Sequence, residues 1–113
     1  MKEIKAIIQP QMLADVVDAL RAIPGLPGIS VSEVRGFGRI SDSDRTASNG
    51  LNLFRDTPMV KLELVVQDQL TSEVISVVGN RARTGRAGDG KIFVYTVDEV
   101  VRIRTGERGE KAI

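Results

Sequence analysis

Glycines and basic residues are concentrated in one short run, Thr84 to Lys91, directly before the apolar run Ile92 to Tyr95. Glycine lets backbone N–H groups approach an anion closely, and it adopts conformations that other residues avoid. Arg86 and Lys91 add positive charge to the same run. The pattern predicts a phosphate-binding loop that leads into a strand. The alternative is a glycine-rich turn whose charges only face water.

This run resembles the P-loop of nucleotide triphosphatases without matching it. Gly85 to Lys91 has the required spacing of Gly, four residues, then Gly-Lys. A P-loop continues with a Ser or Thr that holds magnesium and then with a helix, whereas this chain continues with Ile92 and a β-branched and aromatic run. We therefore predict a nucleotide-binding loop of another kind, without the apparatus for hydrolysis.

Two arginines near the C-terminus form a second candidate for anion binding. Arg102 and Arg104 alternate on an expected strand, so both side chains would project to one face. Guanidinium groups match phosphate oxygens in geometry, and they would complement the point charge of Lys91. Alternatively, both arginines form surface ion pairs with Glu107 or Glu110.

The composition is that of one small globular domain. The chain has 113 residues, 42% hydrophobic and 27% charged, which fits a single domain over residues 1–113. A net charge of +1 and only 4% aromatic residues argue against nucleic acid as a partner. The chain has no Cys, no His and no apolar stretch near the roughly 20 residues of a membrane span. We expect a cytoplasmic protein, not inserted in a membrane, with no metal site.

An internal repeat predicts the fold. Segment 7–17 aligns with segment 65–75, apolar on apolar and acid on acid, and each copy is a short strand followed by a helix start. Pro10 suits the first helical turn and Asp68 suits an N-cap. β-rich runs follow each helix, at 29–34 and 92–95. Two strand–helix–strand units predict an α+β, ferredoxin-like split βαβ fold with an antiparallel sheet. The apolar stripes of the helices are Met12, Leu13, Val16, Val17, Leu20 and Ile23 in the first and Leu70, Val74, Ile75 and Val78 in the second.

The sheet of such a fold needs a partner. Both helices cover one face, so the other face stays open. Val60, Leu62, Leu64 and Val66 alternate with polar residues, as in a strand with one buried face. We therefore expect the chain to assemble.

A polar stretch without periodicity, about 39–58, separates the two halves. A connection of this length inside a compact domain is usually functional or disordered. Its tip, Leu51 to Phe54, carries three apolar residues and Asn52. We predict that this tip contacts a partner protein; the alternative is a disordered excursion without a role.

Three separated motifs give the chain a resemblance to PII signal-transduction proteins. They are Val34–Arg39 (VRGFGR), Thr84–Phe93 (TGRAGDGKIF) and Val101–Glu107 (VRIRTGE), and the resemblance runs nearly end to end. The family consists of trimeric cytosolic regulators that bind ATP or ADP between subunits. The resemblance implies a homotrimer with a T-loop at about 39–58, a B-loop at about 83–91 and a C-terminal segment at about 102–113.

The resemblance also implies the site residues. Gly88, Asp89, Gly90 and Lys91 would hold the nucleotide phosphates with Arg39, and with Arg102 and Arg104 of the adjacent subunit. The nucleoside would lie against Ile7, Ser30, Gly36, Gly38 and Val65. For three of these residues a plainer alternative exists: Gly36 and Gly38 would mark a kink or bulge in a strand, and Asp89 would only shape a turn.

The chain departs from the family pattern at three positions. Family members that sense 2-oxoglutarate have a Gln after the Arg of the Gly-Phe-Gly-Arg motif, which helps hold magnesium; here it is Ile40, which cannot ligate a hard cation. A Lys that contacts the same ligand falls on Met59, and the Tyr that many bacterial members present for nucleotidylation falls on Asn52. We therefore expect neither a typical 2-oxoglutarate response nor nucleotidylation at that position. Whether magnesium accompanies the nucleotide stays open.

The resulting hypothesis is a regulator that binds ADP or ATP and controls a target, such as a membrane transporter or a metabolic enzyme, through its T-loop. The alternative is a small ferredoxin-like enzyme with weak ATPase activity. Catalysis needs positioned acids, bases or nucleophiles, and the chain has no His, no Cys and no hydroxyl after Gly90-Lys91. We therefore expect a protein that is not an enzyme.

Overall fold

The structure, a computed structural model, describes residues 1–39 and 54–113, with the backbone alone at 38–39 and 54–55. Ile40 and three residues of the expected loop tip, Leu51, Asn52 and Leu53, lie outside the described residues. In chain order the elements, with η marking 3₁₀ helices, are β1 (Lys2–Ile8), η1 (Pro10–Met12), α1 (Leu13–Arg21), β2 (Ser30–Arg39), β3 (Phe54–Val66), η2 (Asp68–Leu70), α3 (Thr71–Ala82), β4 (Gly90–Thr96) and η3 (Gly109–Ala112).

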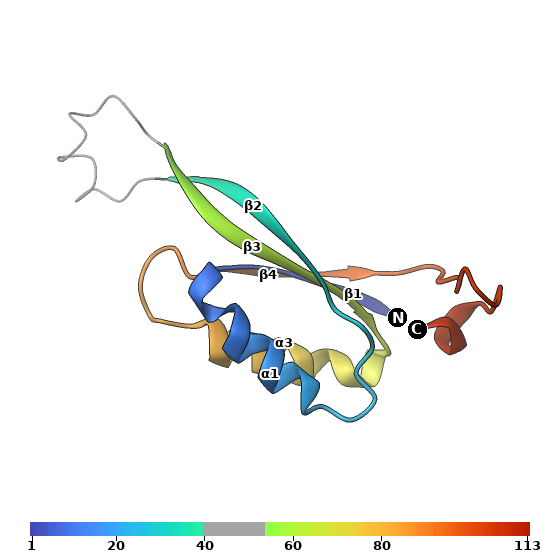
Figure 1. Cartoon of the computed structure of the whole chain (residues 1–113). Coiled ribbons are helices and arrows are strands. Elements are labelled where there is room, and N and C mark those ends of the chain that lie inside the picture. Colours follow the sequence, from blue (N-terminus) through green and yellow to red (C-terminus); the bar gives the residue numbers. More distant parts are fainter. Residues whose placement is uncertain (40–53) are drawn as a thin grey trace, which may run out of the picture.

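The four strands form one antiparallel sheet in the order β2-β3-β1-β4. Both α-helices lie on the same face of this sheet (Figure 1). Each half of the chain runs strand, 3₁₀ turn, helix, strand, so the repeat seen in the sequence is a structural repeat. The prediction of an α+β, ferredoxin-like fold is confirmed.

The core lies between the sheet and the two helices. Alternate residues of β1 and β3 face the helices, because side chains of a strand alternate between its two faces. The helices contribute the residues of the predicted apolar stripes that point inward. The most deeply buried side chains are Ile4, Ile8, Val16, Leu20, Leu62, Val66, Val74 and Val78.

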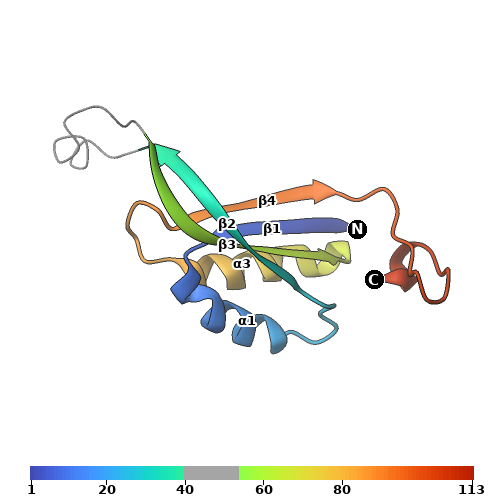
Figure 2. The ribbon, with the colours of Figure 1, turned by 45° about the horizontal axis from the view of Figure 1, so that its top comes forward.

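β2 and β3 are longer than the sheet that they belong to. β1 ends opposite Val60, so residues 54–59 of β3 pair with β2 alone and form a two-stranded arm (Figure 2). An ion pair between Arg35 and Asp56 joins the two strands of the arm. The prediction of a loop through Pro58 is wrong for residues 54–58. A proline is tolerated there because β3 has a free edge beyond the end of β1.

Asp68 does not cap a helix, contrary to the prediction. It is the first residue of η2, and Gln67 takes the capping position without a side-chain hydrogen bond. The Asp68 carboxylate lies 2.8 Å from the N-terminal ammonium instead. Pro10 does lie in the first turn of its helical segment, as predicted.

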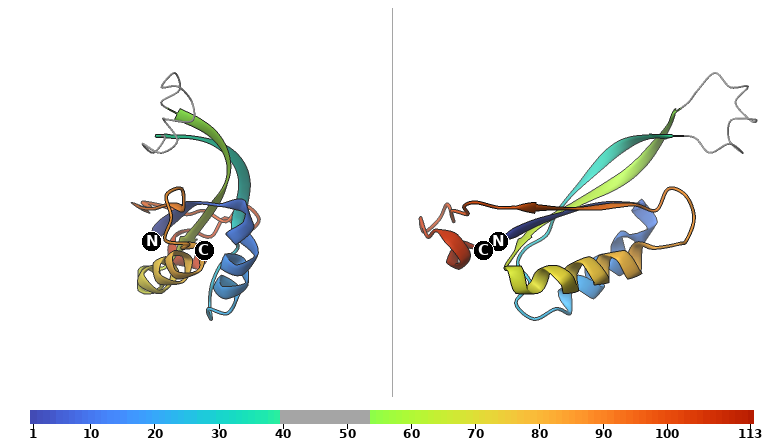
Figure 3. Two further views of the ribbon diagram at one scale, coloured as in Figure 1. Left: turned by 90° about the vertical axis from the view of Figure 1, so that its left-hand side faces the viewer. Right: turned by 180° about the vertical axis from the view of Figure 1, so that it is seen from behind.

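Figure 3 shows both helices on one side of the sheet, and the opposite face carries both charged and aromatic residues. Phe93 and Tyr95 of β4 keep 40% and 45% of their surface exposed there. Lys5 of β1 lies over the Tyr95 ring, 5.0 Å from its centroid, and Lys61 pairs with Glu63 at 3.1 Å. This mixture of apolar area and paired charge suits a protein–protein interface better than a solvent face.

Two glycines of this fold should respond in opposite ways to substitution by alanine. At Gly79, inside α3, the nearest atom to an added Cβ is the Ile92 methyl carbon Cδ1 at 3.9 Å, an ordinary contact. Gly79→Ala should therefore raise the free energy of unfolding by about 0.5 to 1 kcal/mol, because alanine favours the helix. At Gly90 an added Cβ would lie 1.7 Å from the Ile7 carbonyl oxygen.

Urea denaturation of both variants tests this prediction. Gly90→Ala should lower the unfolding midpoint markedly, since the clash is with backbone and φ is positive. Equal effects of the two substitutions would contradict the packing described for α3 and β4.

Candidate functional site

The glycine-rich run forms a loop between the end of α3 and the start of β4. α3 ends at Ala82, and Arg83 is already extended, with φ −76° and ψ 127°. Three glycines of the loop, Gly85, Gly88 and Gly90, have φ between 84° and 101°. Such conformations are unfavourable for residues with a side chain, so this backbone path depends on glycine.

Gly90 fixes the position of the loop against the sheet. It pairs with Ile8 at the start of the β1–β4 ladder, and its α-carbon passes directly beside the backbone of Ile7. No side chain fits into this contact. As a result the loop and Lys91 lie immediately next to β1.

The Asp89 carboxylate holds the loop closed from inside. It accepts hydrogen bonds from the backbone N–H groups of Thr84 at 2.8 Å and Gly85 at 2.9 Å, and from the Thr84 hydroxyl. Gln9 adds a bond from its Nε2 to the Gly88 carbonyl at 3.2 Å. The hydrogen bonds from Thr84 hold the pKa of the Asp89 carboxyl below its usual value.

A cavity of about 520 Å³ opens beside this loop. The loop and β4 form one wall, and the base of the β2–β3 arm forms the other. Its apolar lining comes from Ile7, Phe37, Met59 and Phe93. Its remaining lining residues are Gly36, Thr57, Arg86, Gly88, Asp89, Gly90 and Lys91.

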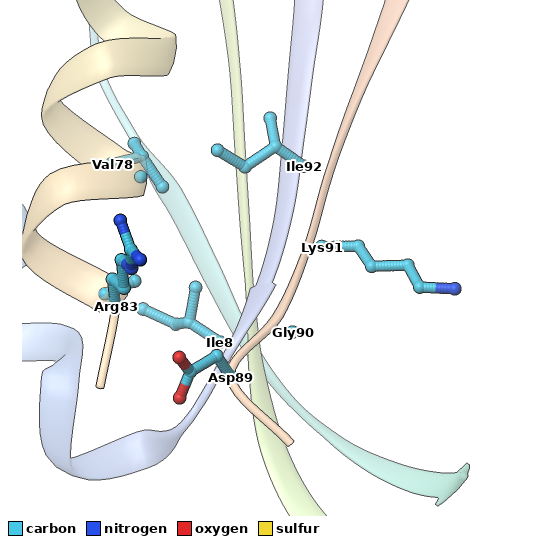
Figure 4. Close-up of a pocket in the computed structure, with 9 residues that line it drawn as sticks. Ile8, Val78, Arg83, Asp89, Gly90, Lys91 and Ile92 are labelled. Atoms are coloured by element: carbon cyan, nitrogen blue, oxygen red, sulfur yellow. The ribbon is translucent and has the colours of Figure 1, made fainter. Parts of the chain in front are cut away.

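Lys91 supplies positive charge on the open face of the sheet. Figure 4 shows its side chain pointing away from α3, whereas Ile8, Val78 and Ile92 lie on the helix side. Lys91 pairs with Ile7 in the strand register, so its ammonium group stands at the edge of the cavity. Together with Arg86 and the loop backbone it can hold an anion, while the apolar side can hold a flat, weakly polar group.

Six of the residues predicted for the nucleotide line this one cavity. They are Ile7, Gly36, Gly88, Asp89, Gly90 and Lys91. Gly36 does not mark a bulge, because it continues the β2–β3 ladder opposite Thr57. An added Cβ at Gly36 would lie 3.3 Å from Met59 Cγ, so the glycine leaves room for the buried Met59 side chain.

Asp89 has a different relation to the loop from the one predicted. Each of its oxygens already accepts hydrogen bonds from the loop itself, which is the turn-shaping alternative. A carboxylate would also repel a phosphate. Gly38 and Arg39 are the last residues of β2, at the far end of the arm, and the Arg39 side chain lies outside the description. The same holds for the side chain of Phe54, the first residue of β3.

Ser30 and Val65 do not reach the cavity. Ile7 faces Lys61 across the ladder, and Val65 lies four residues farther along β3, about 13 Å away. Ser30 pairs with Glu63 at the same end of the sheet as Val65. Within one chain these two residues therefore belong to a second group, at the other end of the molecule from the loop.

The C-terminal arginines belong to this second group, and they do not lie on a strand. Residues 103–105 form a turn, closed by bonds between Arg102 and Glu107 and between Gly106 and Arg102. The prediction that Arg102 and Arg104 share one face of a strand is wrong, because a two-residue bridge, Val101 to Arg108, replaces the strand.

Arg102 instead fastens the C-terminus. Its Nη1 lies 3.1 Å from a Glu107 carboxylate oxygen, so the surface ion pair weighed as an alternative is present. Its Nη2 donates to the backbone oxygens of Lys111 at 3.1 Å and Ile113 at 3.2 Å. Arg104 is exposed in the turn, next to Ile103, which is 99% exposed.

Sequence reasoning missed three residues that line the cavity, Phe37, Thr57 and Phe93. Phe93 was within reach, because it is two residues beyond Lys91 on a strand and so shares its face. Predicting Phe37 and Thr57 would have required the register between β2 and β3, which no local pattern supplies.

Residues 1–39 and 54–113 contain no cluster of three metal-ligating side chains, and no helix among them is long and apolar enough to cross a membrane.

The Asp89 clamp should fail at acid pH. Because the pKa of Asp89 is lowered in the folded loop, its stabilising effect is complete above the ordinary carboxyl pKa near 4 and disappears as pH falls through the lowered value. We expect the protection factors of the Thr84 and Gly85 amides, which compare each exchange rate with that of an unstructured amide at the same pH, to fall as the pH drops below about 4, as NMR can measure. Asp89→Ala should show fast exchange already at neutral pH, whereas Asp18→Ala, an exposed change on α1, should not.

The chain matches the family model described as nitrogen regulatory protein P-II over residues 1–107. It is 48% identical to nitrogen regulatory protein P-II of Rhodospirillum rubrum and 46% identical to that of Azospirillum brasilense, each over all of both chains. It is also 48% identical to nitrogen regulatory protein P-II 2 of Methanothermobacter thermautotrophicus, covering all of this chain and 97% of the relative.

A solved structure agrees with these relatives. The crystal structure of Arabidopsis thaliana PII bound to citrate superposes with a TM-score of 0.80 at 42% identity, covering 99% of this chain and 91% of that one. The fold, the position of the glycine loop and the full-length identity lead to one conclusion. The chain belongs to the nitrogen regulatory protein P-II family.

Proposed function

We propose that the protein is a cytoplasmic homotrimeric regulator that binds ADP or ATP in clefts between subunits and signals to a target protein through residues 39–58. A regulatory role follows from membership of the P-II family. The nucleotide, the trimer and the target are the proposed parts. The observation that carries them is the cavity of about 520 Å³ between the glycine loop and the β2–β3 arm.

The two sides of this cavity suit the two ends of a nucleotide. The loop backbone at Gly88 to Gly90, with Arg86 and Lys91, suits the phosphates. The apolar lining at Ile7 and Phe93 suits a purine, since an aromatic ring stacks well on flat apolar surface.

The second group of predicted residues supports a cleft between subunits. Ser30, Val65 and Arg104 lie at the far end of the sheet from the loop, so one chain cannot bring them to its own cavity. A neighbouring copy could. The open sheet face, with Phe93 and Tyr95 partly exposed, supplies the surface on which copies would pack.

The arm is the proposed route from nucleotide to target. Gly36 and Phe37 of β2 line the cavity, and the same strand leads through Arg39 into the T-loop. A phosphate that contacts Arg39 would favour one arrangement of that loop over another. The apolar tip, Leu51 to Phe54 with Asn52 between, would then contact a transporter or a metabolic enzyme.

The alternative of a weak ATPase lacks a positioned base. Asp89 is the one carboxylate lining the cavity, and its oxygens are engaged by Thr84 and Gly85. The same hydrogen bonds lower the pKa of Asp89, so its carboxylate is a weaker base than an ordinary one and is poorly suited to activate an attacking water. Residues 1–39 and 54–113 supply no other carboxylate to this cavity.

Replacing Lys91 or Arg104 by alanine should weaken adenine-nucleotide binding. The loss of one charge-assisted phosphate contact costs about 1.5 to 3 kcal/mol, or roughly tenfold to a hundredfold in affinity. Isothermal calorimetry with ADP and ATP measures this. Lys2→Ala removes a lysine at the other end of β1 and should leave the affinity unchanged. Unchanged affinity in both Lys91→Ala and Arg104→Ala would contradict the assignment.

Mixed trimers test whether the cleft is shared. A subunit with Arg104→Ala still offers Lys91, and a neighbour with Lys91→Ala still offers Arg104. Trimers assembled from both variants should therefore regain a fraction of sites with wild-type affinity. If mixing restores no such sites, the two residues act within one subunit. Light scattering tests the assembly separately: a monomer would contradict the proposed trimer.

The protein should not bind 2-oxoglutarate tightly in the presence of magnesium and ATP. Met59 is buried and apolar where family members that sense this ligand carry a lysine, and Ile40 offers no oxygen to magnesium. Calorimetry should show at most weak binding in the wild type and a gain in the double variant Ile40→Gln with Met59→Lys. Tight binding of 2-oxoglutarate by the wild-type protein would overturn this expectation.

A further inference from the structure

A second, smaller cavity lies on the other face of β4, directly behind the phosphate loop. It has a volume of about 250 Å³ and opens between the C-terminal end of α3 and the start of β4 (Figure 4). Its apolar lining comes mainly from Ile8, Val78 and Ile92. Lys91 adds only the base of its side chain, since its ammonium group points to the opposite face.

Gly79 keeps this cavity open. It lies in the middle of α3, where glycine costs about 1 kcal/mol relative to alanine. No steric reason requires it within this chain, because an added Cβ would meet only Ile92 Cδ1, at 3.9 Å. A larger side chain would occupy the cavity. The glycine therefore exchanges helix stability for an apolar hollow over Ile8 and Val78, which keep only 2% and 1% of their own surface exposed.

One cation and one anion stand at the rim of this space without pairing. Arg83 and Asp89 both line the cavity, and both lie on the α3 side of β4 (Figure 4). Neither takes part in an ion pair within residues 1–39 and 54–113. The Arg83 guanidinium can therefore accept a carboxylate as a bidentate partner.

The anion also has capacity for a ligand. A carboxylate offers about four acceptor sites. Thr84 and Gly85 fill three of them at short distance, whereas the fourth donor, Gln9 Nε2, lies 3.5 Å away, at the limit of a hydrogen bond. An ammonium group could take the place of Gln9 at Asp89, and Gln9 would still donate its hydrogen bond to the Gly88 carbonyl.

We propose that this cavity binds a small α-amino acid with a branched apolar side chain. Its carboxylate would pair with Arg83, its ammonium group with Asp89, and its side chain would lie on Gly79 and Ile92, over the buried Ile8 and Val78. A closed apolar cavity of about 150 Å³ holds benzene, so 250 Å³ is ample for an aliphatic side chain. A zwitterion satisfies both rim charges, whereas a simple fatty acid or amine satisfies one.

The site would communicate with the loop through Asp89. The same carboxylate that meets the ammonium group holds Thr84 and Gly85 in place. Coupling to nucleotide affinity on the opposite face follows only if the proposed function holds, and it must then be reciprocal. Binding of the amino acid itself does not depend on the nucleotide site.

Methyl-detected NMR on the full chain, without nucleotide, tests the proposal with leucine as the probe. Millimolar leucine should shift the methyl signals of Ile8, Val78 and Ile92. 4-Methylpentanoate, which lacks the ammonium group, and 3-methylbutylamine, which lacks the carboxylate, should each bind at least about tenfold more weakly. Equal binding of either analogue, or no shift with leucine, would overturn the proposal.

Two pairs of variants complete the test. Gly79→Val should fill the cavity and abolish the shifts, whereas Ser76→Val, an exposed change to the same residue type in α3, should not. Arg83→Gln should weaken leucine binding by about tenfold or more, whereas Arg81→Gln should leave it unchanged. If Gly79→Val does not fold, Gly79→Ala and Arg83→Gln still decide the matter. Retained leucine binding in Gly79→Val or Arg83→Gln would refute the assignment.

Discussion

The close contact between Gly90 and the backbone of Ile7 is the constraint on which both cavities depend. A Cβ at Gly90 would stand 1.7 Å from the Ile7 carbonyl oxygen, so β4 can begin here only with glycine. This contact sets the register of β4 on β1, and the register decides which side chain faces which way. Lys91 and Phe93 face the open side, and Ile92 faces the helices. A shift by one residue would exchange the two sets.

Asp89 gives the loop its shape just before that contact. An anion inside a loop that is proposed to bind phosphate looks unfavourable, but the N–H groups of Thr84 and Gly85 stabilise its charge within the loop. The remaining backbone N–H groups and the cations Arg86 and Lys91 then determine what the outer surface of the loop attracts. Asp89 is thus a structural residue whose state can influence binding on both faces of β4.

The candidate anion-binding groups are divided between the two ends of the molecule. The loop, the arm and the cavity lie at one end, and the fastened C-terminal turn lies at the other. The Arg102 guanidinium binds Glu107 and the last residues of the chain, so Arg104 is the more exposed cation of that turn. In the proposed assembly, each copy would supply to the cleft what its neighbour lacks.

The sequence by itself was enough to predict the βαβ repeat, the antiparallel sheet, the inward faces of the helices and the glycine loop. These features depend on local periodicity, on glycine conformation and on strand alternation, all of which are visible within a few residues. The predictions were wrong for the end of the T-loop, for the role of Asp68 and for the strand at Arg102. In each case the structure depends on a partner that the local pattern does not reveal. Residues 54–58 pair with β2, and Asp68 binds the N-terminal ammonium group. Arg102 binds the end of the chain.

The cavities themselves were decided only by the tertiary structure. Phe37 and Thr57 come to Phe93 through strand pairing across the sheet, and Gly79 comes to Ile92 through packing of α3 on β4. A periodic pattern tells which face a residue occupies, but not which residue stands opposite, because register and helix packing depend on the whole core. For this reason the sequence predicted a glycine loop before a strand, whereas the fold alone determined what surrounds that loop.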